Sequence, residues 1–137
     1  MPFPPIRVLV VDDDSAIRMC LCAFLEDEGF RVSSTDSGEA ALERLQREPA
    51  DIAVIDVRLP GLDGDAVILR AHALAPAMQF LVHTGSRSYQ LSAEIMAVGV
   101  GLDDVFQKPV LDMSVIAQAI RRKVGAGTAG QGGQPSP

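Results

Sequence analysis

Four groups of polar residues stand at the ends of short, largely apolar segments, and their side chains suit phosphoryl chemistry. These groups are Asp12-Asp13-Asp14, Asp56, Thr84 and Lys108. Carboxylates that lie close together repel one another, and a divalent cation that prefers oxygen ligands, such as Mg²⁺, relieves this repulsion. An ammonium group and a hydroxyl group bind the oxygens of a phosphoryl group. If the fold brings the four groups together, they meet the demands of phosphoryl transfer to an aspartate carboxylate.

The segments that must position these groups are of two alternating kinds. Short apolar runs typical of strands cover residues 6–11, 30–35, 52–55, 80–82 and 105–107. The spacing of apolar residues predicts helices around residues 17–25, 41–45, 65–75, 89–98 and 113–124. Asp14 or Ser15 is expected to cap the first helix, and Gly29 lies just past its end.

This alternation predicts an α/β fold with a doubly wound, five-stranded parallel sheet and five helices. Residues 8–11 are apolar at every position, which is typical of a central parallel strand covered on both faces. Right-handed crossovers restrict the topology to a few doubly wound orders, and the flavodoxin-like order 2-1-3-4-5 suits five strands. The first and third strands are then neighbours, so Asp12, Asp13 and Asp56 are expected to meet at the carboxyl edge, where open sheets of this kind bind ligands.

The motifs at these strand ends resemble those of receiver domains of two-component response regulators, of the chemotaxis or single-domain type. The resemblance covers about residues 6–124, almost the whole of the expected folded part. The segments that carry it are Val10-Val11-Asp12-Asp13-Asp14, Asp56 with Leu59-Pro60-Gly61-Leu62-Asp63-Gly64, Thr84-Gly85, and Gly101-Leu102-Asp103-Asp104 leading to Lys108-Pro109.

By this resemblance, Asp56 accepts a phosphoryl group from a phosphohistidine of a histidine kinase or histidine phosphotransfer protein. Thr84 and Lys108 would hold the phosphoryl oxygens, and the bond between Lys108 and Pro109 would be cis. The chain would act in phosphorelay signal transduction, switching a face made of the fourth helix, fifth strand and fifth helix toward a downstream protein target. It would not be an enzyme in its own right, although it would assist its own phosphorylation and dephosphorylation.

The same resemblance implies a metal site. Mg²⁺, with Mn²⁺ as a substitute, would be bound by Asp13, by Asp56 and by the backbone carbonyl of Arg58. Asp12 would reach the ion through a water molecule.

Two departures from the family pattern concern the switch and the lifetime of the phosphoryl group. The family usually has an aromatic residue three positions before the lysine, where this chain has Val105, which is too small and too stiff to act in the same way. Phe106 is expected to face the opposite side of the sheet, in the core. We therefore expect the signal to travel through the backbone of residues 85–90 and the fourth helix. Arg58 and Ser86 occupy positions that border the phosphoryl site in the family.

The histidines and cysteines have ordinary structural interpretations. His83 precedes Thr84 on a strand and is expected to face away from the site, in the core or against a helix, whereas His72 is expected at the surface. Cys20 and Cys22 would point about 200° apart on one helix and cannot bond to each other. Cys20 belongs to the apolar stripe and is expected to be a core thiol in a reducing cytosol.

Length, composition and net charge limit the number of domains and the classes of partner that this chain can have. The chain has 137 residues, of which 47% are hydrophobic, enough for one domain with a core. A net charge of -6 argues against direct nucleic acid binding, and the apolar runs are too short to span a membrane, so a cytoplasmic location is expected. We expect a receiver domain over residues 1–124 and a flexible tail, or the start of a linker, over residues 125–137.

Three alternatives compete with this interpretation. A phosphatase or phosphotransferase with an aspartyl-phosphate intermediate usually needs a second acid close behind the nucleophile, and Val57-Arg58 provides none. A flavin or nucleotide binder of the same fold would be expected to carry a glycine-rich phosphate loop after the first strand, which is absent here. A pseudo-receiver would bind partners without phosphorylation, and the loss of the aromatic at Val105 keeps this alternative open. Whether the domain is a stand-alone regulator or part of a longer protein also stays open.

Overall fold

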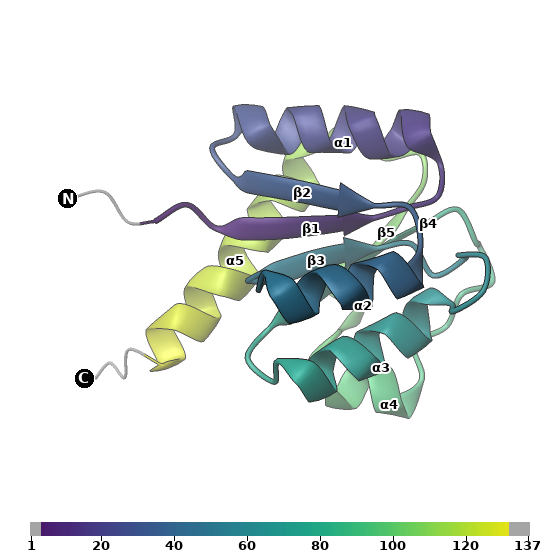
Figure 1. Ribbon diagram of the computed structural model, residues 1–137. Helices are drawn as coiled ribbons and strands as arrows, with labels where there is room; N and C mark the ends of the chain where they lie inside the picture. The colour runs from purple at the N-terminus through teal and green to yellow at the C-terminus, as the bar shows by residue number, and fades with distance from the viewer. Residues whose placement is uncertain (1–3, 132–137) are drawn as a thin grey trace.

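A computed structural model describes residues 4–131 of the chain as a single parallel sheet covered by helices on both faces (Figure 1). The strand order is β2-β1-β3-β4-β5 and every neighbouring pair is parallel, which confirms the predicted flavodoxin-like topology. The strands are β1 (Arg7–Val11), β2 (Arg31–Thr35), β3 (Ile52–Ile55), β4 (Gln79–Thr84) and β5 (Val105–Gln107). The helices are α1 (Ser15–Asp27), α2 (Gly38–Arg47), α3 (Gly64–Leu74), α4 (Ala93–Ala97) and α5 (Ser114–Gln131), with a short 3-10 helix at Leu102–Asp104.

Alternate residues of the buried strands point to two separate apolar cores. Leu9 and Val11 of β1 pack with side chains from α2, α3 and α4, whereas Val8 and Val10 pack with side chains from α1 and α5. Figure 1 shows α1 and α5 on one side of the sheet and the other three helices on the opposite side. Because both faces of the sheet are covered here, β1 is apolar and buried from Val8 to Val11, and β3 is apolar at every position.

Side-chain caps set where the helices begin at the carboxyl edge of the sheet. Asp14 caps α1 by accepting a hydrogen bond from the Ile17 backbone nitrogen at 3.1 Å. Asp63 caps α3 in the same way, with the Ala66 nitrogen at 2.9 Å from its carboxylate. Each cap satisfies a backbone donor that the first turn of a helix leaves free. The caps therefore fix the loops that carry the candidate site.

Two helix boundaries differ from the prediction. The fourth helix begins only at Ala93, because the Ser92 hydroxyl caps it by accepting from the Ile95 nitrogen at 3.1 Å. The fifth helix continues past Val124 to Gln131, since extending an existing helix requires no new nucleation. The first part of the expected tail is therefore helical, and its remainder, residues 132–137, lies outside the described residues.

Two side chains are placed differently from the prediction. Cys20 is exposed, because the buried positions of α1 are Leu21 and Leu25, and it is Cys22 that packs partly against the core. His72 is half-buried rather than at the surface, and its Nδ1 atom is buried without a hydrogen-bond partner.

Within residues 4–131, no helix has both the length and the apolar character that crossing a membrane requires.

Candidate functional site

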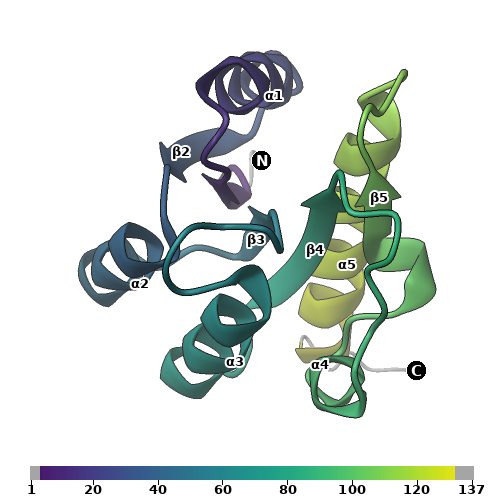
Figure 2. The ribbon, with the colours of Figure 1, turned by 90° about the vertical axis from the view of Figure 1, so that its right-hand side faces the viewer.

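The four predicted groups meet at the carboxyl edge of the sheet, which Figure 2 shows from the front. Asp12 and Asp13 follow β1, and Asp56 follows β3, the neighbouring strand. Each of these three residues offers a carboxylate oxygen, and these oxygens lie within 4.8 Å of one another. The structure thus brings together residues that are more than forty positions apart in the sequence, as the strand order predicted.

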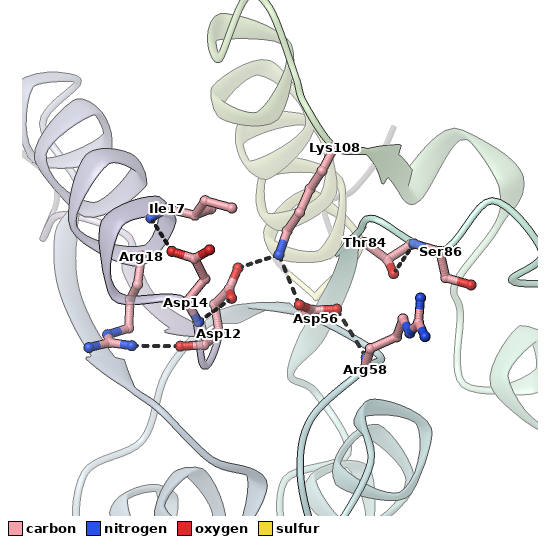
Figure 3. A network of polar contacts seen from close by, with 9 residues as sticks. All are labelled: Asp12, Asp14, Ile17, Arg18, Asp56, Arg58, Thr84, Ser86 and Lys108. Carbon is pink, nitrogen blue, oxygen red and sulfur yellow. Dashed lines mark hydrogen bonds and ion pairs between the residues drawn. The ribbon is translucent and has the colours of Figure 1, made fainter.

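Lys108 supplies the positive charge of the site. Its ammonium lies 2.8 Å from Oδ2 of Asp12 and 2.8 Å from Oδ2 of Asp56 (Figure 3). Burial by itself would lower the pKa of Lys108, but the hydrogen bonds to Asp12 and Asp56 outweigh this effect and raise the pKa above its usual value. The two carboxylates therefore favour the charged form of the Lys108 side chain.

The remaining oxygens of the two buried carboxylates are bound by the backbone. Asp12 is only 2% exposed, and its Oδ1 accepts from the Asp14 nitrogen at 2.9 Å. Asp56 is 6% exposed, and its Oδ1 accepts from the Arg58 nitrogen at 3.0 Å. Asp13 is exposed to solvent. The cluster thus consists of two fixed carboxylates and one that solvent and solutes reach freely.

Thr84 stands at the end of β4 and is fully buried. Its Oγ1 accepts a hydrogen bond from the Ser86 nitrogen at 3.0 Å, and its carbonyl accepts from the Lys108 nitrogen at 2.8 Å. The bond between Lys108 and Pro109 is cis, as the resemblance implied. These contacts connect the end of β4 to the residue that carries the ammonium.

The donor set fits a hard divalent cation. Three carboxylates face one ammonium in the cluster, so negative charge is in excess. Oxygen ligands from one or two carboxylates, completed by water and phosphate oxygens, are what Mg²⁺ prefers. Asp13 and Asp56 suit this role. Direct binding of the ion by the Arg58 carbonyl, and contact of Asp12 with the ion through a water molecule, stay predictions.

Two arginines, Arg58 and Arg18, lie beside the loops around the site. The Arg58 side chain is exposed and, in the view of Figure 3, extends on the side of Thr84 and Ser86. Arg18 of α1 donates from Nη1 to the Asp12 carbonyl at 2.7 Å. Sequence reasoning singled out Arg58 but missed Arg18, which lies on the helix that the aspartate triplet introduces.

Another missed contact fixes the loop after β4. Gln107 Nε2 donates to the Ser86 carbonyl at 2.9 Å, across 21 positions. Its place directly before Lys108 was the only sequence signal for it. The Ser86 backbone is therefore held on both sides, by Thr84 and by Gln107.

His83 and Phe106 face the side predicted for them. His83 is 3% exposed and borders an apolar groove of about 450 Å³ between α1 and the segment after β5. Burial lowers the pKa of His83, and the nearby charge of Lys108 lowers it further. Phe106 packs partly against the core on the α1 and α5 side, whereas Val105 packs against the opposite core.

Together, the fold and the site define an α/β domain with a candidate cation site at its carboxyl edge, and known proteins resemble this chain in sequence and in fold. Residues 8–121 match the family described as the response regulator receiver domain, and the chain belongs to this family. Response regulator GtcR of Aneurinibacillus migulanus is 32% identical over 111 residues, which cover 81% of this chain and 45% of that protein. Sensor histidine kinase GacS of Pseudomonas protegens is 30% identical over 145 aligned positions, which cover 92% of this chain and 14% of that protein.

The fold agrees with that of a solved relative. The crystal structure of a CheY-like response regulator receiver domain protein from Methanospirillum hungatei JF-1 matches with a TM-score of 0.84 at 28% identity, covering 93% of this chain and 99% of that chain. The chain spans less than half the length of GtcR and of GacS. The comparisons thus identify a receiver domain of two-component response regulators, a family of signalling domains.

Proposed function

We propose that Asp56 accepts a phosphoryl group from a phosphohistidine of a sensor kinase or a histidine phosphotransfer protein, in a reaction that depends on Mg²⁺. The observation that carries the proposal is the position of the Asp56 carboxylate, which contacts Lys108 at 2.8 Å and shares a cluster with Asp12 and Asp13. Among the described residues, this carboxylate alone combines an ammonium partner, an acidic cluster and a neighbouring buried threonine.

The transfer exchanges one phosphorus bond for another. A carboxylate oxygen of Asp56 forms a bond to phosphorus while the bond from phosphorus to the donor imidazole nitrogen breaks, and the released imidazole takes up a proton. When bound, Mg²⁺ supplies positive charge that neutralises the phosphoryl oxygens. Lys108 neutralises a further oxygen, and the Thr84 hydroxyl donates a hydrogen bond to another.

The output is proposed to be a change in the face formed by α4, β5 and α5, which binds a downstream protein. Moving a two-state equilibrium from 1:99 to 99:1 takes about 5.5 kcal/mol of differential binding. Hydrogen bonds to a charged group contribute roughly 1.5–3 kcal/mol each, so new contacts from Thr84 and Lys108 supply most of that amount. Phosphoryl transfer to Asp56 and the change in the binding face are both signalling steps. Neither turns over a separate substrate.

The proposed partners are proteins in the cytoplasm. The similarity of this chain to a segment of GacS, a sensor histidine kinase, and to GtcR, a response regulator, supports a kinase or phosphotransfer partner. The net charge of -6 supports contacts with proteins rather than with nucleic acid. The pseudo-receiver alternative gains no support, because Asp13, Asp56, Thr84 and Lys108 are all present at one edge of the sheet.

Labelling of wild type and of Asp56→Asn with acetyl phosphate, followed by intact mass measurement and peptide mapping, tests the proposal. Wild type should gain one phosphoryl group on Asp56, and Asp56→Asn should gain none. Asp103→Asn, which removes an exposed carboxylate of the 3-10 helix, is the matched control and should be labelled like wild type. Stoichiometric labelling of Asp56→Asn would refute the assignment.

A further inference from the structure

Tyr89 connects the loop after β4 to the first turn of α3. Its hydroxyl donates to Oδ1 of Asp65 at 2.9 Å, across 24 positions. Its ring is half-buried and packs against the apolar core beneath α2, α3 and α4, the same core that Val105 contacts. This chain therefore has an aromatic ring on the side of the sheet where the family's usual aromatic residue is replaced by Val105.

The Asp65 end of this bond is fixed to the end of β3. Asp65 is the second residue of α3 and follows Gly64, whose nitrogen donates to the Val57 carbonyl at 3.0 Å. A Cβ atom at Gly64 would lie 2.5 Å from the carbonyl oxygen of Asp56, so only glycine permits this close approach. The first turn of α3 thus lies directly against the backbone of the proposed phosphoacceptor.

The Tyr89 end follows the loop that leaves Thr84. The Ser86 nitrogen donates to Thr84 Oγ1 at 3.0 Å, and Tyr89 lies three residues further along. The segment from β4 to α4 passes in front of β5 in the view of Figure 2. A shift of the Thr84 hydroxyl would therefore pull on Ser86 and, through it, on Tyr89.

The bond has a neutral donor and a charged acceptor. Burial raises the pKa of Tyr89, and the bond to Asp65 raises it further, so the phenol keeps its proton. Burial also raises the pKa of Asp65, although the bond from Tyr89 opposes this. Hydrogen bonds to an ionised acceptor are stronger than neutral ones, so this contact favours the arrangement that contains it.

We propose that Tyr89 is the positioning residue that couples the phosphorylation site to α4, in place of an aromatic residue at position 105. In the resting protein the bond to Asp65 holds the loop after β4. When Thr84 moves toward a phosphoryl group on Asp56, the bond breaks and the loop is released. The inference rests on the proposed phosphorylation of Asp56.

Release of this loop would directly affect α4, which is part of the proposed binding face. Ser92, three residues after Tyr89, caps α4, and the one buried side chain of this helix is Ile95. A helix held by a single buried residue is displaced at low cost. Its exposed Met96 would move with it and present a changed apolar surface to a partner.

Tyrosine emission provides a direct readout, because the chain contains one tyrosine and no tryptophan. A carboxylate that accepts from the phenol quenches its emission, since the excited phenol is a stronger acid and loses its proton to the acceptor. Wild type should therefore emit weakly at rest and more strongly when saturated with Mg²⁺ and beryllofluoride, an analogue of the phosphoryl group. Asp65→Ala should emit strongly before the analogue is added.

Affinity for the analogue provides the second readout. Tyr89→Phe keeps the ring and removes only the hydroxyl, so the resting arrangement loses its bond while packing is retained. By linkage, this variant and Asp65→Ala should bind beryllofluoride about threefold to tenfold more tightly than wild type, as measured by ¹⁹F NMR titration. Asp103→Ala is the control and should bind like wild type. A purely structural role of the ring predicts no change in Tyr89→Phe.

The outcomes separate the inference from the function on which it rests. Increased emission on saturation together with tighter binding by both variants supports the coupling role. Unchanged emission in wild type that is demonstrably labelled at Asp56, or unchanged affinity in both variants, overturns the coupling role alone. Wild type that is neither labelled nor saturated by the analogue overturns the proposed function and the inference together.

Discussion

Asp56 and Lys108 are 52 positions apart in the sequence, yet the Lys108 ammonium donates to Asp56 Oδ2 over 2.8 Å. The same ammonium lies 2.8 Å from Asp12, and the three side chains are at most 14% exposed. In this arrangement one cation offsets two carboxylates that have little access to water. At rest, Lys108 therefore balances the charge of the two carboxylates. A metal ion that binds to these carboxylates must compete with Lys108 for them.

Replacement of the ammonium should have opposite effects on stability and on metal affinity. Lys108→Met leaves two buried carboxylates unpaired and should lower the free energy of unfolding by about 3 kcal/mol in the absence of divalent ions. Removal of a nearby positive charge should raise the affinity for Mg²⁺ by about tenfold or more. Urea denaturation and calorimetric titration measure the two quantities. Arg47→Met, at an exposed position of α2, should change neither, and equal Mg²⁺ affinity in Lys108→Met and wild type would contradict the prediction.

The acidic residues should contribute unequally to metal binding. Asp13 is exposed and suits direct coordination, whereas Asp12 is buried and already bound by the Asp14 nitrogen and Lys108. Asp13→Ala should abolish Mg²⁺-dependent labelling of Asp56, and Asp12→Ala should reduce it less completely. Labelling rates across a Mg²⁺ and Mn²⁺ series check this, with Asp103→Ala as the control. Unchanged labelling in excess chelator would rule out a role for the metal.

The strand order and the meeting of the four polar groups were predictable because simple rules determine them. Apolar, branched runs such as residues 8–11 fit a strand covered on both faces, and right-handed crossovers leave few possible orders. The order then places Asp56 beside Asp12 without any knowledge of the loops. Alternation along β5 likewise placed Val105 and Phe106 on opposite faces.

Contacts that depend on loop geometry were not predictable. The bond from Tyr89 to Asp65 spans 24 positions and the bond from Gln107 to Ser86 spans 21, and no periodicity specifies either pair. The predicted start of α4 was wrong because the apolar spacing that suggests a helix includes Leu91. Leu91 belongs to the loop before the helix, and the Ser92 cap marks where the helix begins. The prediction that Cys20 lies in the core was wrong, because the apolar stripe of α1 is wider than the surface that the sheet covers.

The ion pair of Arg7 and Asp51, at the opposite edge of the sheet, should make the stability of the fold depend on pH. The Arg7 backbone nitrogen donates to Asp51 Oδ2 at 2.8 Å, and its Nη2 donates to Oδ1 at 2.9 Å. Burial by itself would raise the pKa of Asp51, but the bonds from Arg7 outweigh it and lower the pKa below its usual value. A carboxylate of this kind stabilises the fold above its unfolded pKa, and that contribution is lost as pH falls through the lower, folded pKa.

Asp51→Asn should therefore lower the free energy of unfolding by about 1 kcal/mol at pH 7, a value reduced by solvent screening of the partly exposed pair. The difference from wild type should shrink as pH falls below about 4. Urea denaturation at several pH values measures it. Glu43→Gln, at an exposed position of α2, should stay close to wild type throughout, and a difference between Asp51→Asn and wild type that persists at low pH would contradict the explanation.

The phosphoryl group on Asp56 should be long-lived for this family, because Ser86 and Arg58, the two rim residues that border it, do not assist hydrolysis. Ser86 has no carboxylate or amide to orient an attacking water, and its hydroxyl lies 3.3 Å from that of Ser88. The Arg58 nitrogen donates to Asp56 Oδ1 at 3.0 Å, and its side chain extends on the side of Thr84, where it would lie across the phosphoryl group (Figure 3).

Changing either rim residue should shorten the lifetime. Ser86→Glu adds a carboxylate that orients water, and Arg58→Asn removes the cationic cover and adds an amide. A well-placed group of this kind typically accelerates reactions by about 10²–10⁴-fold, so a less precisely placed group at an exposed rim position should give about tenfold. Decay of labelled protein, followed by intact mass after removal of the donor, measures the rates. Arg87→Asn, at an exposed arginine of the same loop, controls for loss of charge, and failure of both rim variants to accelerate decay would show that the lifetime is set elsewhere.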